Sequence, residues 1–151
     1  MSECWVCEMT TANEVPGGTI HETASWIVDH CVGPLGIGTL IVRPKRHVIH
    51  VASLDAGEAY ELGPLLQRAA AVVTELVAPS QVYVTLWSHA GGEASHIHFV
   101  VQPVTDEQVA ELGLFGPRLQ VEMFSRKLEP DPAAMAEFAA RARAAWPAGT
   151  A

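Results

Sequence analysis

The sequence is short of positive charge, of cysteine and of long apolar runs. Lysine and arginine together number 9 against 17 aspartates and glutamates, which gives a formal net charge of −8. A phosphate backbone needs a basic protein surface, so this balance argues against a general nucleic-acid-binding protein. The one basic cluster, Arg43, Lys45 and Arg46, is too small to change that conclusion and suits a solvated turn. Three cysteines, an odd number, disfavour a secreted domain held together by disulfides.

Hydrophobic residues make up 49% of the chain, yet no apolar run is long enough to cross a membrane. The first residues, Met1-Ser2-Glu3-Cys4, are acidic and polar where a signal peptide would be basic and then apolar. We therefore expect a cytoplasmic protein with neither a membrane nor a nucleic acid as partner. The 151 residues suit one domain with a sizeable core. We place this domain at residues 1–125, with residues 126–151 as a C-terminal helical extension packed on it.

The apolar pattern predicts an α+β domain with an antiparallel sheet of about five strands and one long helix. Ser53 or Asp55 can cap the long helix, which should reach about Val77 and be kinked or divided at Gly63-Pro64. Shorter helices should follow Thr105 or Asp106 and again Asp131, whereas residues 118–124 are ambiguous. The strand-like segments are residues 18–22, 25–29, 39–42, 82–87 and the stretch that starts near Ser95.

Two histidines in that last stretch form the most informative motif of the chain. In Ser95-His96-Ile97-His98-Phe99-Val100-Val101-Gln102-Pro103 the apolar Ile97, Phe99 and Val101 alternate with a second set that contains both histidines. On a strand the two imidazoles would project from one face, about 7 Å apart. Two histidines on a rigid strand suit metal binding, nucleophilic catalysis, or one of each. The preceding residues 88–93 are polar and loop-forming, as the rim of a site often is.

Cys4 and Cys7 have the spacing that lets two thiolates reach one metal ion from a tight turn. A redox pair and two incidental buried cysteines are the alternatives. Zinc would need two more ligands, and histidine must supply them because no second cysteine pair exists. Spacing alone does not choose among His21, His30, His47, His50, His89, His96 and His98.

With these motifs in place, the chain resembles the histidine triad superfamily, whose members carry His-x-His-x-His followed by two apolar residues. His96-Ile97-His98-Phe99-Val100-Val101-Gln102-Pro103 matches at its first two histidines and at the proline. The segment from Gly38 to His47, which ends in Pro44-Lys45-Arg46-His47, looks like the family's strand ending in Pro-Lys-x-His. An amino-terminal Cys-x-x-Cys occurs in many bacterial members. The resemblance covers roughly residues 4–104.

The resemblance implies a structural zinc held by Cys4, Cys7, His47 and His96. It also implies that His98 is the catalytic nucleophile, attacking the α-phosphorus of a nucleotide-like small molecule. The expected activity is hydrolysis of a nucleotide phosphoester, phosphoramidate or polyphosphate, or nucleotidyl transfer. Family members commonly form homodimers through the long helix and adjacent strands, so a homodimer is implied as well.

The chain departs from the family pattern at several substrate-binding positions. Val100 stands where the third histidine should be, and Gly91-Gly92-Glu93 replaces the usual Gly-Gln-Ser/Thr. We take Gly92, Glu93, Ser95 and Val100 as the residues facing the substrate. The ribose-binding position falls on Cys31 or His30 when aligned from Pro44, and on Asp29 if the loop is longer.

These departures keep two other functions open. One is a catalytically degenerate module that binds a nucleotide or a protein. The other is transfer as in the related uridylyltransferases, whose glutamine two residues after the second histidine is matched here by Val100. Gln102 lies two residues further along the same strand face.

Overall fold

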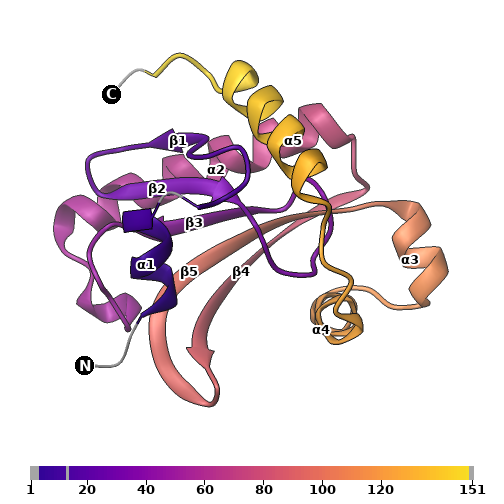
Figure 1. Ribbon diagram of the computed structural model, residues 1–151, viewed down its shortest axis with the longest axis horizontal. Helices are drawn as coiled ribbons and strands as arrows, with labels where there is room; N and C mark the ends of the chain where they lie inside the picture. Colours follow the sequence, from indigo (N-terminus) through magenta and orange to yellow (C-terminus); the bar gives the residue numbers. More distant parts are fainter. Residues whose placement is uncertain (1–3, 13, 150–151) are drawn as a thin grey trace.

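The computed structural model describes residues 4–12 and 14–149 and has the α+β architecture predicted from the sequence (Figure 1). The strands form one antiparallel sheet in the order β1-β2-β3-β5-β4. Their bounds are β1 (His21–Glu22), β2 (Trp26–His30), β3 (Leu40–Pro44), β4 (Gln81–Ala90) and β5 (Glu93–Val104). The helices are α1 (Trp5–Ala12), η1 (Val51–Ser53), α2 (Ala56–Val77), α3 (Asp106–Leu112), α4 (Pro117–Arg126) and α5 (Pro132–Ala145).

One face of the sheet carries the main core, covered by α2 and α5 (Figure 1). Leu40 and Val101 of the sheet pack there with Leu65 of α2 and Phe138 of α5. Asp55 caps α2, as predicted, and forms a reciprocal capping box with Glu58. The helix is continuous from residue 56 to residue 77, so of the two predicted effects of Gly63-Pro64, a kink or a division, the division does not occur.

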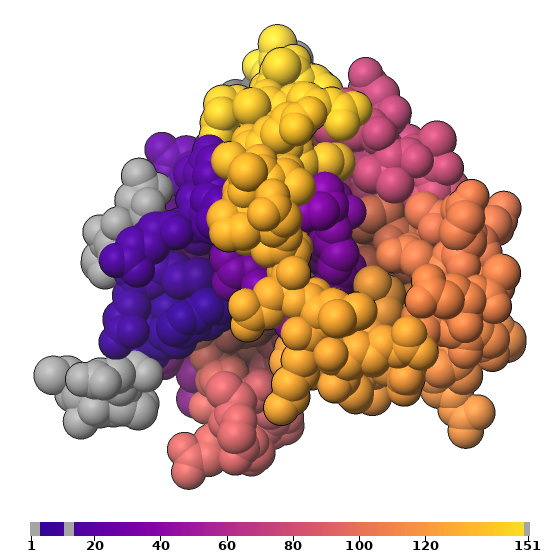
Figure 2. All heavy atoms as spheres, turned by 45° about the vertical axis from the view of Figure 1, so that its right-hand side comes forward, coloured from indigo at the N-terminus to yellow at the C-terminus, as the bar shows by residue number. Residues whose placement is uncertain are grey.

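The opposite face of the sheet carries α1 and α4. Figure 2 shows α1 in indigo and α4 in orange on the same side of the molecule, with the salmon tip of the β4–β5 hairpin below them. Residues 118–124, ambiguous in sequence, lie within α4, which begins at a proline in the first helical turn. The histidine face of β5 is therefore partly covered, and His96 is fully buried.

The polar segment before the histidines is not a loop, as the sequence suggested. It is the tip of a long hairpin in which Ala90 pairs with Glu93 and only Gly91 and Gly92 form the turn. Both glycines have positive φ angles, 59° and 85°, which a two-residue turn of this hand requires. An irregularity between Trp87 and His89 shifts the register within this hairpin.

Two further segments differ from their predicted form. Cys4-x-x-Cys7 runs into helix α1 and does not form a tight turn, while the predicted strand at 18–22 is reduced to His21–Glu22. Among the residues that the structure describes, no helix is both long and apolar enough to span a bilayer.

Candidate metal centre and active site

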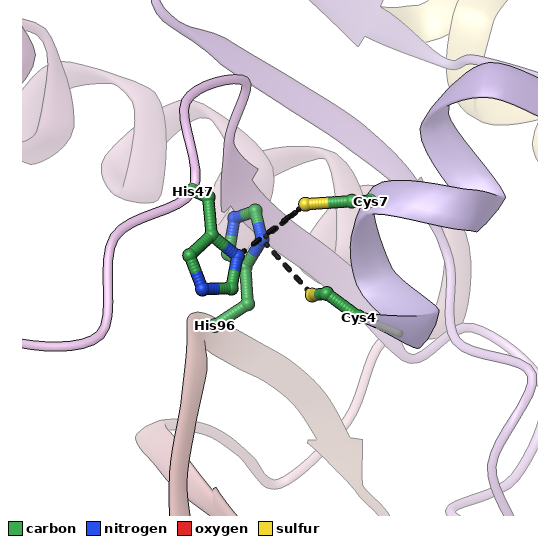
Figure 3. A group of neighbouring side chains, drawn as sticks. All are labelled: Cys4, Cys7, His47 and His96. Carbon is green, nitrogen blue, oxygen red and sulfur yellow. Dashed lines mark hydrogen bonds between the residues drawn. The ribbon is translucent and has the colours of Figure 1, made fainter. Parts of the chain in front are cut away.

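Four side chains from three distant segments meet beside the sheet. Cys4 and Cys7 come from the start of α1, His47 from the turn after β3, and His96 from β5 (Figure 3). Each offers one ligand atom, and these four atoms lie within 4.8 Å of one another. The cluster is the set that the resemblance implied, and its donor atoms could hold a metal ion.

The distances within this cluster fit a tetrahedral zinc site. Sulfur lies 3.6 Å from nitrogen between Cys4 and His96, 3.4 Å between Cys7 and His47, and 3.4 Å between Cys7 and His96. Bonds of about 2.3 Å to sulfur and about 2.0 Å to nitrogen at tetrahedral angles place sulfur and nitrogen ligands about 3.5 Å apart. In both histidines the nitrogen that faces the sulfurs is Nδ1.

The other nitrogen of His96 is also engaged. Its Nε2 donates to the backbone carbonyl of Pro44 at 2.9 Å, which fixes the ring and leaves Nδ1 as the free donor atom for a metal. Burial lowers the pKa of His96 to about 4, so the imidazole is neutral near pH 7, as a ligand must be. Burial and the adjacent Cys4 raise the pKa of the Cys7 thiol to about 11. A cation between the two sulfurs would reverse that preference and stabilise the thiolates.

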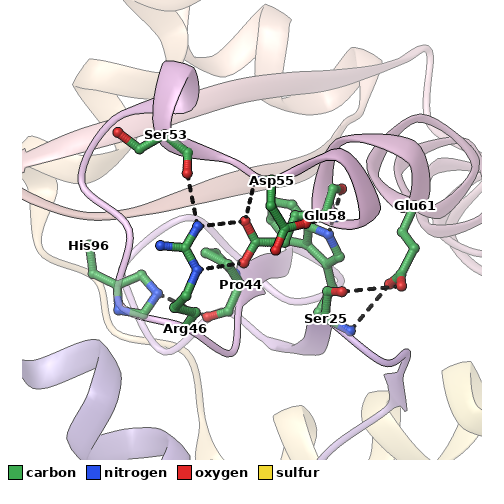
Figure 4. A network of polar contacts seen from close by, with 9 residues as sticks. Ser25, Pro44, Arg46, Ser53, Asp55, Glu58, Glu61 and His96 are labelled. Carbon is green, nitrogen blue, oxygen red and sulfur yellow. Dashed lines mark hydrogen bonds and ion pairs between the residues drawn. The ribbon is translucent and has the colours of Figure 1, made fainter.

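A polar network holds the turn that carries His47 (Figure 4). The Arg46 guanidinium donates from Nε and Nη2 to the two carboxylate oxygens of Glu58 at 2.9 and 2.8 Å, and Nη2 also reaches the carbonyl of Ser53. Glu58 is itself in the capping box of α2. The start of the long helix thus fixes the position of the turn next to the metal cluster.

A cavity of about 900 Å³ opens beside this cluster, which is within the usual size range of ligand sites. Helix α1, the segment after β2, strands β3 to β5 and α4 all contribute to its lining. Both His96 and His98 line it, together with Cys4 and His47, but of the motif's two histidines only His96 belongs to the metal cluster. The structure therefore distinguishes the two histidines of the motif: His96 contacts the cysteines, whereas His98 lies outside the cluster and lines the cavity.

His98 is held in one orientation. Its Nδ1 donates to the backbone carbonyl of His96 at 3.2 Å, so in the neutral ring the lone pair is on Nε2. Burial lowers the pKa of His98 below its ordinary value; the hydrogen bond to His96 opposes this shift, and the positive charge of Arg43 adds to it. A neutral, oriented imidazole in a ligand-sized cavity can act as a nucleophile.

Arg43 is a cavity residue that the sequence did not reveal. Grouped with Lys45 and Arg46 it suited a solvated turn, but its side chain points from β3 into the protein and is only 2% exposed. Its Nε and Nη2 donate to one carboxylate oxygen of Asp29 at 3.1 and 2.6 Å, and Nη1 contacts the Thr10 hydroxyl of α1. The alternation of Ile41 and Arg43 along the strand was the one available signal, because both line the cavity.

Of the four predicted substrate-facing residues, all but Gly92 line the cavity. Ser95 is half-buried and lines it, and Glu93 lines it from the exposed hairpin tip. Gly92 lies in the turn itself and is exposed. Val100 lines the cavity but is buried against Cys31 and Leu35, so this position presents no hydrogen-bond donor.

The three possible ribose-binding residues have different surroundings. Asp29 lies in the cavity wall and is paired with Arg43. His30 is buried; its Nδ1 donates to the Cys31 carbonyl and its Nε2 accepts from the Gly38 amide. Burial raises the pKa of Cys31 to about 11, which keeps its thiol protonated.

Gln102 is fully buried and does not line the cavity's described wall. Its amide donates to the Leu35 carbonyl and accepts from the Gln120 amide of α4. The glutamine that could have supported the transferase interpretation therefore serves the packing of α4 on the sheet.

No protein-family model matches the sequence, and no curated protein matches it in sequence. Solved structures do match the fold. A zinc-bound histidine triad family protein from Mycobacterium smegmatis is 18% identical, with 94% of each chain covered and a TM-score of 0.65. A hypothetical histidine triad nucleotide-binding protein from Sulfolobus tokodaii is 17% identical over 93% of this chain and 90% of that chain, with a TM-score of 0.69.

A third match is a Hit-like protein involved in cell-cycle regulation from Bartonella henselae. It is 18% identical over 92% of this chain and 94% of that chain, with a TM-score of 0.67. The order of elements, the five-stranded antiparallel sheet and these matches agree. The chain therefore has the fold of the histidine triad proteins, as its motifs indicated.

Proposed function

We propose that this protein is a hydrolase or nucleotidyltransferase that uses His98 as a nucleophile on a nucleotide-like substrate. One observation carries the proposal: His98 faces a ligand-sized cavity with its Nδ1 bound to a carbonyl, so that Nε2 is the attacking atom. The histidine triad fold supports it, and one structurally similar protein is described as nucleotide-binding.

The reaction would proceed in two displacements. Nε2 of His98 attacks the α-phosphorus; a phosphorus–nitrogen bond forms, and the bond to the leaving group breaks with its electron pair. The leaving group takes up a proton from solvent as it departs, since the Nδ1 proton of His98 stays hydrogen-bonded to the His96 carbonyl. Water then attacks the nucleotidyl-histidine and releases a nucleoside monophosphate, or a second hydroxyl or phosphate acceptor takes the nucleotidyl group.

The substrate-facing residues would have separate roles in this reaction. The Ser95 hydroxyl can donate to a phosphate oxygen from the cavity wall. Asp29 can accept from a ribose hydroxyl through Oδ1, since both Arg43 contacts are to Oδ2. Glu93 lines the cavity from the hairpin tip, next to Gly92 in the turn, and Val100 supplies apolar contact.

We also propose that Cys4, Cys7, His47 and His96 bind a structural zinc. The four ligand atoms close the coordination shell, leaving no position for substrate. Bound there, zinc would supply no step of the reaction; it would fix His96, and with it the strand that carries His98. Two thiolate ligands also suit the reducing cytoplasm, where we expect the protein to work.

Trapping the covalent intermediate tests the nucleophile directly. We expect a panel comprising a nucleoside phosphoramidate, a nucleoside diphosphate sugar and a dinucleoside polyphosphate to yield at least one nucleotidyl adduct. Mass spectrometry after digestion at neutral pH should locate it on His98, because phosphorus–nitrogen bonds to histidine are lost in acid. An adduct on another residue would contradict the mechanism.

The alternative is a binding module without turnover. Val100 favours it, because valine has no hydrogen-bond donor at the position of the third histidine. Loss of one donor to the charge that develops in a transition state can lower the rate ~10²–10³-fold. Tight binding of a nucleotide with neither adduct nor turnover across the panel would establish this alternative.

A homodimer joined through β4 is the proposed assembly. This strand ends the sheet, and Val84 and Leu86 on it are 44% and 42% exposed. An unpaired edge with apolar side chains favours strand pairing with a second copy. Light scattering should give twice the chain mass, and Leu86→Lys should shift it to that of a monomer. Val121→Lys, a matched change at an exposed apolar position of α4, should leave the dimer intact.

A further inference from the structure

The cavity has an aromatic side, next to His98 on β4 and α4. Trp87 pairs directly with His98 across the hairpin, and their ring centroids are 6.5 Å apart with planes at 34°. Phe124 of α4 lies 5.0 Å from the Trp87 ring. Both aromatic side chains line the cavity together with His98. A substrate held for attack by His98 would therefore lie beside these rings.

A buried network fixes the orientation of Trp87. Its indole Nε1 donates to the Gln120 side-chain oxygen and to the Thr85 hydroxyl, each at 3.3 Å. Gln120 is 4% exposed, and its amide donates to Gln102 at 2.9 Å. Because the indole N–H is used inside the protein, Trp87 can offer a ligand its ring surface but not a hydrogen bond.

The charges in the cavity lining limit what can be bound there. Arg43 is the one lysine or arginine in the described lining, and Asp29 already neutralises it on the β2–β3 side of His98. Glu93 and Glu129 add two exposed carboxylates. A leaving group with several negative charges would therefore find no unpaired cation, whereas a neutral or positively charged group would be accepted.

We propose that Trp87 and Phe124 form a subsite for the leaving group and that it selects a planar aromatic group that is neutral or cationic. The inference rests on the proposed function and narrows its substrate class. An aryl or arylalkyl amine attached to the α-phosphorus meets both requirements. It is neutral in the phosphoramidate and cationic once released and protonated.

Two adenosine 5′-phosphoramidates of similar size test this selection. One carries benzylamine and the other cyclohexylmethylamine, so they differ mainly in aromaticity. The wild-type protein should prefer the benzyl compound in kcat/KM. Trp87→Leu and Phe124→Leu should each lower that preference about fivefold, the range expected for one aromatic contact. Comparing ratios between variants cancels the difference in amine basicity.

Two further variants serve as controls. Phe115→Leu removes an aromatic ring that is 76% exposed and lies outside the cavity lining, and it should leave the preference unchanged. Trp87→Phe keeps an aromatic ring at this position and should keep most of the preference for the benzyl compound. A preference within twofold of wild type in Phe124→Leu, and in Trp87→Leu if that variant folds, would overturn the subsite while leaving the proposed function intact. A change in the preference between adenosine and uridine substrates, without a change between the two amines, would also overturn it.

If the wild-type protein hydrolyses neither compound, the subsite can still be tested by binding. Equilibrium dialysis of the same two phosphoramidates then measures binding alone. Selective loss of benzyl-compound affinity in Trp87→Leu, by about fivefold, supports the subsite. Equal affinities of both compounds for the wild-type protein overturn it.

Discussion

Replacing His98 by asparagine is expected to abolish turnover, with a loss in kcat of about 10³-fold or more, as for other enzymes that lose their nucleophile. Asparagine is similar in size, and its side-chain amide can keep the hydrogen bond to the His96 carbonyl. The change therefore removes Nε2 while preserving the local structure. Steady-state rates on a substrate found in the nucleotide panel measure the effect.

His89→Asn provides the matched control for this change. His89 also lines the cavity, but it is exposed near the hairpin tip. We expect its replacement to change kcat less than tenfold. Turnover by His98→Asn within tenfold of the wild-type rate, in a protein of unchanged fold and metal content, would exclude the covalent mechanism.

Loss of the metal is expected to have the second large effect. The protein as purified should contain about one zinc per chain, and Cys7→Ser should lose it, because Cys7 contacts both histidines of the cluster. Closed zinc sites contribute directly to folding, so the Tm should fall by on the order of 10 °C. Elemental analysis and thermal unfolding measure the two quantities separately.

Cys31→Ser is the control, since Cys31 lies in a separate apolar cluster with Leu35 and Val100. It should keep the zinc even if burying a hydroxyl lowers its stability. Hydrogen exchange adds a local readout: removing the metal should increase exchange in α1 more than in α2 or α5. Metal-free protein with an unchanged Tm would refute a structural zinc.

Three helices, α2, α3 and α5, were predictable because their start signals are local. Asp55 and Thr105 were candidate caps in the sequence, and a helix was expected from Asp131; each of the three accepts a hydrogen bond from the backbone of its own helix in the structure. The alternation in β5 likewise predicted that His96 and His98 share a face. These features depend on residues a few positions apart, so sequence alone contains the information.

The metal cluster depends on long-range contacts. Cys4 and His96 are 92 positions apart, and no spacing rule could select His47 and His96 from the histidines of the chain. The family resemblance made that selection, and the geometry of the four residues is consistent with it. Their role as zinc ligands stays a prediction until metal is measured.

The cross-strand neighbour of His98 could not be predicted from the sequence, for another reason. A regular hairpin continued from Gly91-Gly92 would place Thr85 opposite His98, but the irregularity between Trp87 and His89 puts Trp87 there. Such bulges are set by tertiary packing and re-aim side chains near sites. The ion pair of Arg43 with Asp29 was equally hidden, since it joins adjacent strands whose pairing the sequence did not specify.

Helix α1, with Cys4 directly before it, carries two of the four proposed metal ligands and also contributes Trp5 and Met9 to the cavity wall. Metal affinity and substrate affinity would then both depend on the same equilibrium, the docking of α1 on the sheet. By thermodynamic reciprocity, a ligand that contacts Trp5 or Met9 would tighten zinc binding by the factor by which zinc tightens its own. Zinc retention under a competing chelator would accordingly report on the occupancy of the cavity.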